Sequence, residues 1–413
     1  MSPRLLVHGG SVFDPVSGTA APADVVIDGE QIVEVGPGLD GDTALDATGH
    51  LVVPGFIDCH VHVTLDDVDV LRLIQSPFSL RFFQAVRNLR LTLHAGVTTV
   101  RDAAGADLGV KQAVDTGLID GPDMQIAIGM LSQTGGHADE WMPSGECVHA
   151  LWPPHPGCPS TIVDGVDEMR RKVRELIRAG ADVIKVATTG GVVSPCSDPR
   201  RAHLASEELA VMMVEARAAR VHVMAHAQGT DGVKNAVRCG VRSVEHGVYL
   251  DEEAVAMMVD NGTWLVPTLS APRALLRLAQ TGAGITATTR TKVADVVEAH
   301  DESLRLAHAA GVRIAMGTDA GIAPHGHNLA ELELMHDQGL SPGDALRAAT
   351  TSAAELLGAG DQIGELAPGK RADLVLLDGT DISVRGLSER VQAVIHRGTI
   401  HVDKISTRIA QWA

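Results

Sequence analysis

The sequence predicts an α/β protein: a (β/α)8 TIM barrel with a small β-domain formed by strands from the two ends of the chain. Eight short apolar runs alternate with stretches of helical period between residues 56 and 359, whereas the flanking segments contain only strand patterns. With 413 residues, 45% of them apolar, the chain can bury a large core. We therefore expect a composite β-domain of residues 1–55 and 360–413, and a barrel over residues 56–359.

The predicted β-domain begins with short strands in segments 4–15, 24–38 and 44–55. Glycines and the pair Asp28-Gly29 supply turns between them, and no stretch of helical period intervenes. The same pattern returns in segments 363–379 and 391–403. We expect these two sets of strands to combine beside the barrel.

The barrel is predicted from repeated βα units. Helices are expected at residues 79–95, 166–179, 206–219 and 290–310, several of which begin with a capping Ser, Thr or Asp and end before a glycine. An open doubly wound sheet is the alternative, but no GxGxxG follows the first run. The eight predicted barrel strands are residues 55–63, 96–104, 124–130, 181–189, 221–229, 241–249, 263–270 and 312–320.

One segment fits neither strand nor helix. Residues 131–163 are rich in proline and glycine and follow the third run. A loop of this length inside a compact domain is typically a lid or a binding loop.

Composition and charge exclude several partners. The net charge of -18 argues against nucleic acids and anionic membranes, which both require basic surfaces. The five cysteines are odd in number and irregularly spaced, as in a reducing compartment. No secretory signal and no run of 18 apolar residues is visible. We expect a cytoplasmic protein that acts on a small molecule.

Polar residues follow several of the predicted barrel strands. His60 and His62 share one side of the first strand, where they could bind a metal or could be two hydrogen-bonded core histidines. A single histidine on a strand is usually a core residue, but a group at the strand ends, where barrel enzymes carry their catalytic residues, is difficult to explain by packing. The other members of the group are Lys185, His226, His246 and Asp319.

These motifs resemble those of the amidohydrolase superfamily, specifically its binuclear-metal branch. The resemblance covers nearly the whole chain, including "PGFIDCHVH", "GVTTVRD", "IKVATTGGVVSP", "AHA", "EHG", "GTDAG" and "GELAPGKRADLVLLD". Within the superfamily, "TGGHAD", "GGVVSPCSDP" and "PHGHNLAELELM" are most similar to the imidazolonepropionase-related group, which includes metal-dependent Xaa-Pro dipeptidases.

The resemblance implies a pair of divalent metal ions. His60, His62 and Asp319 would hold one ion, and two further histidines, His226 and His246, the second. Lys185 would be carboxylated and bridge the pair, because a protonated amine would repel both ions. Zinc is expected first from the imidazole ligands, although manganese, cobalt and iron also fit the oxygen ligands. Asp319 would transfer a proton during catalysis.

Substrate contacts are predicted in the loops. By resemblance, His137 in "TGGHAD" and His325 in "PHG" match positions near substrate. Gln228 stands where dipeptidase-like relatives often have a tyrosine that holds the substrate carboxylate, which places Xaa-Pro specificity in question. The only tyrosine is Tyr249. The loop after the fourth strand offers further donors for a carboxylate: Arg200, Arg201 and His203.

The predicted function is a binuclear metal-dependent amidohydrolase that cleaves a dipeptide of the Xaa-Pro type or an N-acyl L-amino acid. A cyclic amide, lactone or phosphoester hydrolase could use the same metals. A mononuclear deaminase or imidazolonepropionase-type enzyme would generally lack Lys185, and a non-catalytic binding protein would usually have lost ligands. The resemblance also implies a homo-oligomer.

Overall fold

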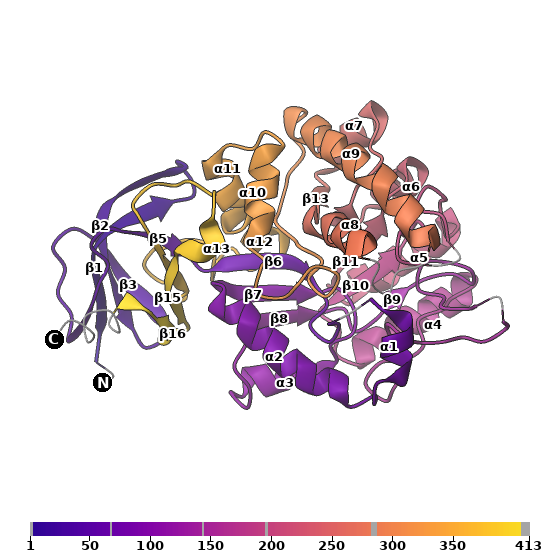
Figure 1. Cartoon of the computed structure of the whole chain (residues 1–413), viewed down its shortest axis with the longest axis horizontal. Helices are drawn as coiled ribbons and strands as arrows, with labels where there is room; N and C mark the ends of the chain where they lie inside the picture. The colour runs from indigo at the N-terminus through magenta and orange to yellow at the C-terminus, as the bar shows by residue number, and fades with distance from the viewer. Residues whose placement is uncertain (1–2, 67, 143, 195–196, 282–286, 406–413) are drawn as a thin grey trace.

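Strands from both ends of the chain share one sheet in the computed structural model, which describes residues 3–66, 68–142, 144–194, 197–281 and 287–405 (Figure 1). This sheet has eight strands in the order β16-β15-β14-β5-β1-β2-β3, with β4 paired to β1. Its strands are β1 (Leu5–Asp14), β2 (Thr19–Asp28), β3 (Gln31–Gly36), β4 (Thr43–Asp46), β5 (His50–Pro54), β14 (Leu374–Asp378), β15 (Val391–His396) and β16 (Thr399–Asp403).

The eight-stranded sheet encloses a hydrophobic cluster of its own. Val7, Val25, Ile27, Ile32 and Ile395 are each at most 2% exposed and belong to one cluster. They come from both ends of the chain, so burial of these side chains favours the pairing that the sequence predicts. The domain boundaries near residues 55 and 360 stay a prediction.

Parallel strands form the second part of the molecule, toward the right of Figure 1. They make a three-stranded sheet, β6-β7-β8, and a five-stranded sheet, β13-β12-β11-β10-β9. Strands such as β6 and β10 are buried along their whole length, as expected of parallel strands covered by helices. The strands are β6 (Phe56–Val61), β7 (Val97–Asp102), β8 (Asp123–Ile126), β9 (Met130–Leu131), β10 (Val183–Ala187), β11 (His222–Ala227), β12 (Ser243–His246) and β13 (Trp264–Val266).

The third predicted strand is divided in two. β8 pairs with β7, whereas β9, a few residues later, pairs with β10. Between them Ile128 has a φ of 67°, a left-handed conformation that interrupts a strand. The third run therefore connects the two parallel sheets.

The eighth predicted strand makes only isolated bridges. The backbone N–H of Leu265 donates to the carbonyl of Arg313 at 2.8 Å, and the backbone N–H of His62 donates to the carbonyl of Ala320 at 2.7 Å. The segment thus lies between β13 and β6. Its backbone passes close to β13 at Gly317, where a Cβ would lie 2.3 Å from Val266, and is irregular at Asp319, whose φ is 57°.

Helices connect the parallel strands, and the predicted ones correspond to α2, α4, α5 and α9. Gly180 and Gly311 have positive φ and follow α4 and α9, as predicted. Ser79 stands at the predicted N-cap position of α2 but makes no side-chain cap bond. The cap predicted at Ser206 is wrong, because Ser206 lies inside α5, where Glu208 accepts the N–H of Ala205. The helices are α1 (Val70–Gln75), α2 (Leu80–His94), α3 (Leu108–Asp115), α4 (Val166–Arg178), α5 (Ser206–Ala218), α6 (Thr230–Cys239), α7 (Glu252–Asn261), α8 (Ser270–Thr281), α9 (Ala287–Ala309), α10 (Ala330–Asp337), α11 (Pro342–Ala348), α12 (Thr351–Leu356) and α13 (Leu387–Arg390).

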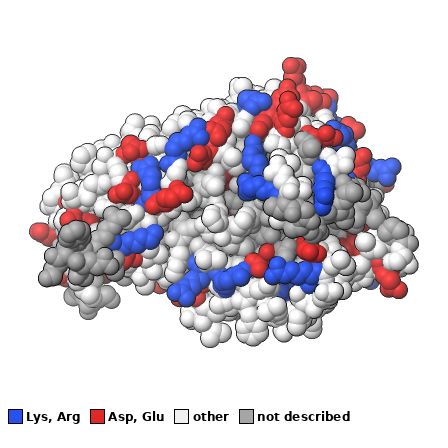
Figure 2. All heavy atoms as spheres, in the orientation of Figure 1, with Lys and Arg blue, Asp and Glu red and all other residues white. Residues whose placement is uncertain are grey.

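The surface carries charges of both signs. Figure 2 shows acidic and basic side chains interspersed over the visible face. Among the helices that the structure describes, none has the length and apolarity needed to cross a membrane.

Candidate active site

The carboxyl ends of the parallel strands converge on one pocket. The six predicted metal-site residues all line it, although they are up to 259 positions apart in the chain. Parallel strands place their carboxyl ends at one edge, so residues distant in sequence meet there. The six residues are His60, His62, Lys185, His226, His246 and Asp319.

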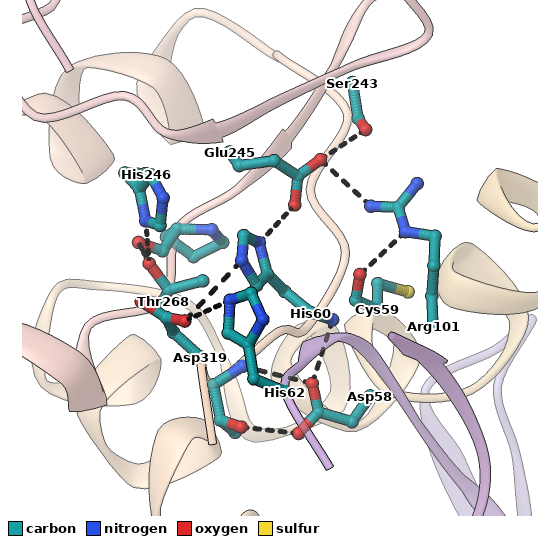
Figure 3. A network of polar contacts seen from close by, with 12 residues as sticks. Asp58, Cys59, His60, His62, Arg101, Ser243, Glu245, His246, Thr268 and Asp319 are labelled. Carbon is teal, nitrogen blue, oxygen red and sulfur yellow. Dashed lines mark hydrogen bonds and ion pairs between the residues drawn. The ribbon is translucent and has the colours of Figure 1, made fainter. Parts of the chain in front are cut away.

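Three of these residues form a compact group of ligand atoms. One atom each from His60, His62 and Asp319 lies within 4.8 Å of the others. Asp319 Oδ1 is 3.2 Å from His62 Nε2 and 3.6 Å from His60 Nε2 (Figure 3). The backbone N–H of Asp319 donates to the carbonyl of His60 at 2.7 Å, which fixes the carboxylate beside the imidazoles. Two imidazoles and one carboxylate are a suitable ligand set for a divalent metal ion.

Hydrogen bonds orient the imidazole rings of the two histidines on the first barrel strand, His60 of β6 and His62 just after it. His62 Nδ1 donates to the carbonyl of Ala104 at 2.8 Å, because a carbonyl can only accept. His60 Nδ1 lies 2.8 Å from Glu245 Oε2, which likewise accepts. Both rings therefore turn Nε2 toward Asp319; Nε2 of His62 donates to this carboxylate, and a metal ion would take the place of that proton.

The other two histidines are oriented in the same manner. His226 Nε2 donates to the carbonyl of Gly190 at 3.0 Å, which leaves the lone pair on Nδ1. His246 Nδ1 lies 2.7 Å from Thr268 Oγ1, whose own hydroxyl donates to the carbonyl of Pro267. His246 Nδ1 is thus the donor, and its Nε2 is unprotonated. The two rings are 4.6 Å apart between centroids and could supply two ligands to a second ion.

Lys185 stands among these groups without a partner. Its side chain is 1% exposed, and Nζ has no hydrogen-bond partner among the described residues. Burial lowers its pKa to about 8, although the negative charges of Glu245 and Asp319 oppose the shift. A buried, unpartnered amine that readily loses its proton fits the predicted carboxylation.

The charge states also suit a cation. Burial alone would raise the pKa of Asp319, but the hydrogen bond from His62 and the charges of His60 and His62 hold it at about 2. Burial, followed by neighbouring positive charge, lowers the pKa of His60, His226 and His246 well below the usual range. For His62, burial is outweighed by Asp319, and its pKa is raised.

Sequence reasoning missed the groups behind the ligands (Figure 3). Glu245 also accepts a hydrogen bond from Arg101 at 2.9 Å, and Arg101 donates to the carbonyl of Cys59 at 2.7 Å. Asp58 accepts the N–H of His60 at 3.1 Å and the hydroxyl of Thr318 at 2.6 Å. Each of these charged residues is inside an apolar run, which is an unusual position for a charge and was the available signal.

Two predicted substrate contacts line the pocket. His137 stacks on His226 with 4.1 Å between ring centroids. Burial and then the charge of Lys185 lower the pKa of His137 to about 3, so its ring is neutral. Gln228 also lines the pocket, and its Oε1 has no partner within the described part of the chain.

The remaining predicted contacts do not line this pocket. Arg200 and Arg201 are exposed, and the guanidinium of Arg200 lies 4.3 Å from the ring centroid of Tyr249. His203 is buried elsewhere, and His325 Nε2 donates to the carbonyl of Leu65 at 3.0 Å. Their roles in substrate binding stay predictions.

A mostly apolar wall completes the pocket and was not predicted. It combines residues from the loop after β9, from the segments after β10 and after residue 320, and from two helices, α8 and α9, so no local pattern marks it. Its members include Trp152, Val192, Val193, Leu275, Val296 and Ile322.

The model of the amidohydrolase family matches residues 51–402. The chain belongs to the amidohydrolase family. Ochratoxinase of Aspergillus niger is 34% identical over 358 residues, which cover 84% of this chain and 74% of the relative. A prolidase structure with bound N-methylphosphonate-L-proline is 36% identical with a TM-score of 0.89, covering 97% of this chain and all of that one. The structure of a Xaa-Pro dipeptidase with bound methionine in the active site is 31% identical with a TM-score of 0.88. The match likewise covers 97% of this chain and all of that one.

These likenesses confirm the family and the resemblance to Xaa-Pro dipeptidases. The fold is therefore of the TIM-barrel type, and this member of the amidohydrolase family is a hydrolase that acts on amide bonds.

Proposed function

We propose that this amidohydrolase cleaves a Xaa-Pro dipeptide or an N-acyl L-amino acid, using two divalent metal ions and a carboxylated Lys185. The observation that carries the proposal is the buried, unpartnered Nζ of Lys185, which shares one pocket with four oriented histidines and an ionised aspartate. The neutral amine would add carbon dioxide and lose a proton, and the resulting carbamate would replace a buried cation by an anion.

The ligand atoms divide into two sets. His60, His62 and Asp319 would hold the first ion, His226 and His246 the second, and the carbamate of Lys185 would bridge them. When bound, the ions would lower the pKa of a water molecule and polarise the substrate carbonyl. Zinc fits the imidazole ligands best, and manganese, cobalt or iron would tolerate the oxygen ligands.

Asp319 is the proton carrier in this proposal. With a pKa near 2 it is ionised at neutral pH and can accept the proton of the attacking water. The same carboxyl group can then deliver that proton to the leaving nitrogen, which avoids expulsion of an amide anion.

His137 and Gln228 are the best-placed groups to bind the leaving amino acid. Both line the pocket, and each has a buried polar atom without a partner in the described chain. His137, whose ring nitrogen can donate, replaces the exposed Arg200 and Arg201 as the candidate for the substrate carboxylate, whereas the unpartnered Oε1 of Gln228 can only accept a hydrogen bond. The apolar wall would receive the other side of the amide bond.

A substrate screen with metal analysis tests this function. We expect L-Met-L-Pro or N-acetyl-L-proline to be hydrolysed, with about two metal ions per chain. Esterifying the proline carboxylate should reduce kcat/KM by two or more orders of magnitude, because buried polar groups would lose their partner. Turnover of lactones or phosphoesters alone would contradict the amide assignment.

We also propose that the parallel strands and segment 312–320 form a closed barrel, and that segments 1–55 and 360–413, of which the structure describes residues 3–55 and 360–405, form a separate β-domain. Support comes from the hydrogen bonds of segment 312–320 to both β13 and β6, and from the separate hydrophobic cluster of the eight-stranded sheet.

A further inference from the structure

The long loop after β9 places one tryptophan in the pocket. Trp152 lines the pocket, and its ring lies 5.6 Å from that of His62 between centroids. Its Nε1 is buried and has no acceptor anywhere in the described residues. A buried indole N–H normally has a hydrogen-bond partner, so this donor faces a position that a ligand could fill.

The backbone that carries Trp152 is held from two sides. Arg81 of α2 donates to the carbonyls of Ala150 and Leu151 at 3.2 and 3.1 Å. Glu140 accepts the N–H of Leu151 at 2.9 Å. The guanidinium of Arg81 and the carboxylate of Glu140 together fix the peptide planes that precede Trp152. The position of the Trp152 backbone is therefore set before any ligand arrives.

Trp152 and His137 stand at opposite ends of a series of ring contacts. The series runs from Trp152 through four metal-site rings to His137, with centroid distances of 5.6, 5.5, 5.1, 4.6 and 4.1 Å. Because four imidazole rings separate the two residues in this series, we infer that the acyl group lies toward Trp152 when His137 binds the leaving amino acid. The four rings between them are His62, His60, His246 and His226.

The lining of the pocket as a whole is unsuited to a positive charge on the acyl portion of the substrate. Asp319 is the only carboxylate among the described lining residues, and it belongs to the metal site. A free α-ammonium group has donors only, so it could not accept from the indole N–H of Trp152. Without a carboxylate partner, its burial against Val192 and Leu275 would be unfavourable.

We propose that Trp152 determines specificity, by donating its indole N–H to an oxygen on the acyl portion of the substrate. This inference rests on the proposed function and narrows it to N-acyl L-amino acids with a neutral, oxygen-bearing acyl group. Free dipeptides with an α-ammonium group are then poor substrates.

Matched substrates test the role of Trp152. Two pairs of N-acyl-L-prolines differ at one position of the acyl chain, where one member has an ether oxygen and the other a methylene group. The first pair is N-methoxyacetyl-L-proline and N-butanoyl-L-proline. The second pair is N-(3-methoxypropanoyl)-L-proline and N-pentanoyl-L-proline. In the wild-type enzyme we expect kcat/KM to favour the oxygen member of at least one pair by about tenfold, mainly through KM. L-Ala-L-Pro should be slower than both members of that pair.

Variants separate the N–H from the ring and from the loop. Trp152→Phe should bring the favoured kcat/KM ratio to about one, with the metal content unchanged. Arg81 lies outside the pocket, and Arg81→Met should reduce the kcat/KM ratio of the oxygen to the methylene substrate by releasing the loop that carries Trp152. Arg81→Lys should retain part of this ratio. Trp141→Phe is the matched control, since Trp141 belongs to the same loop, is 46% exposed and does not line the pocket.

The proposal is wrong if neither wild-type ratio exceeds about two, if Trp152→Phe keeps the preference, or if L-Ala-L-Pro is the best substrate. The wild-type ratios decide the matter even where a variant fails to fold. Failure of the proposed function is distinguishable, because no L-proline amide would then be cleaved and no metal would be bound.

Discussion

At the scale of single residues, Lys185 has the largest expected effect on the metal site. Lys185→Ala removes the proposed bridge, so we expect metal content to fall from about two ions per chain to one or fewer, with nearly complete loss of turnover. Formate or acetate should partly restore both by supplying a carboxylate. Metal analysis and kcat measure this, with Lys234→Ala, a surface lysine paired with Asp251, as control. Two ions and wild-type turnover in Lys185→Ala would disprove the carbamate.

Asp319 tests the proton transfer separately. Asp319→Asn keeps an oxygen near His60 and His62 but cannot accept a proton. We expect near-normal folding and a kcat reduced by about 100-fold or more, as for the loss of a general acid/base. Steady-state kinetics combined with thermal unfolding would show it. Full kcat in the variant would assign the proton to another group.

At the scale of elements, one buried ion pair connects three strands. Arg101 of β7 pairs with Glu245 of β12, which in turn holds His60 of β6. Arg101→Met would leave Glu245 as an uncompensated buried charge, so we expect a loss of about 3–5 kcal/mol in unfolding free energy. Urea unfolding measures this change. Arg174→Met, which breaks the exposed pair with Glu215, should leave stability within error. Equal effects of the two variants would refute the special role of the buried pair.

At the scale of the whole molecule, an ionic cluster joins the eight-stranded sheet to the parallel strands. Asp123 of β8 lies beside Arg371 and accepts from Arg397 at 2.7 Å. His396, at the end of β15, donates to Asp373 at 3.0 Å. Burial would lower the pKa of His396, but hydrogen bonds to Asp123 and Asp373 raise it above 6.5.

The raised pKa of His396 predicts a pH dependence of stability. A group with a higher pKa in the folded protein stabilises fully below its unfolded pKa of about 6.5, and this contribution is lost as pH rises through the folded value. Unfolding free energies measured from pH 6 to 9 should therefore fall more steeply for the wild type than for His396→Gln. Parallel curves would show that His396 does not contribute in this range.

The order of strands and helices was largely predictable because it is local information. An apolar run of period two, or a helical stretch before a glycine such as Gly180, shows its structure within about twenty residues. His60 and His62 could be assigned to one side of a strand for the same reason. The interruption at Ile128 and the cap of α5 were missed, because packing overrides the preferences of single residues there.

The sequence by itself therefore determined the succession of βα units and, through motif likeness, the residues proposed for the metal site. Only the tertiary structure decided what surrounds them: that Arg101 pairs with Glu245, that Arg200 lies over Tyr249 rather than in the pocket, and that Trp152 enters it. The physical reason is that periodicity reports which face of an element is buried. Contacts between loops and distant strands depend on how those elements pack, and no local pattern records them.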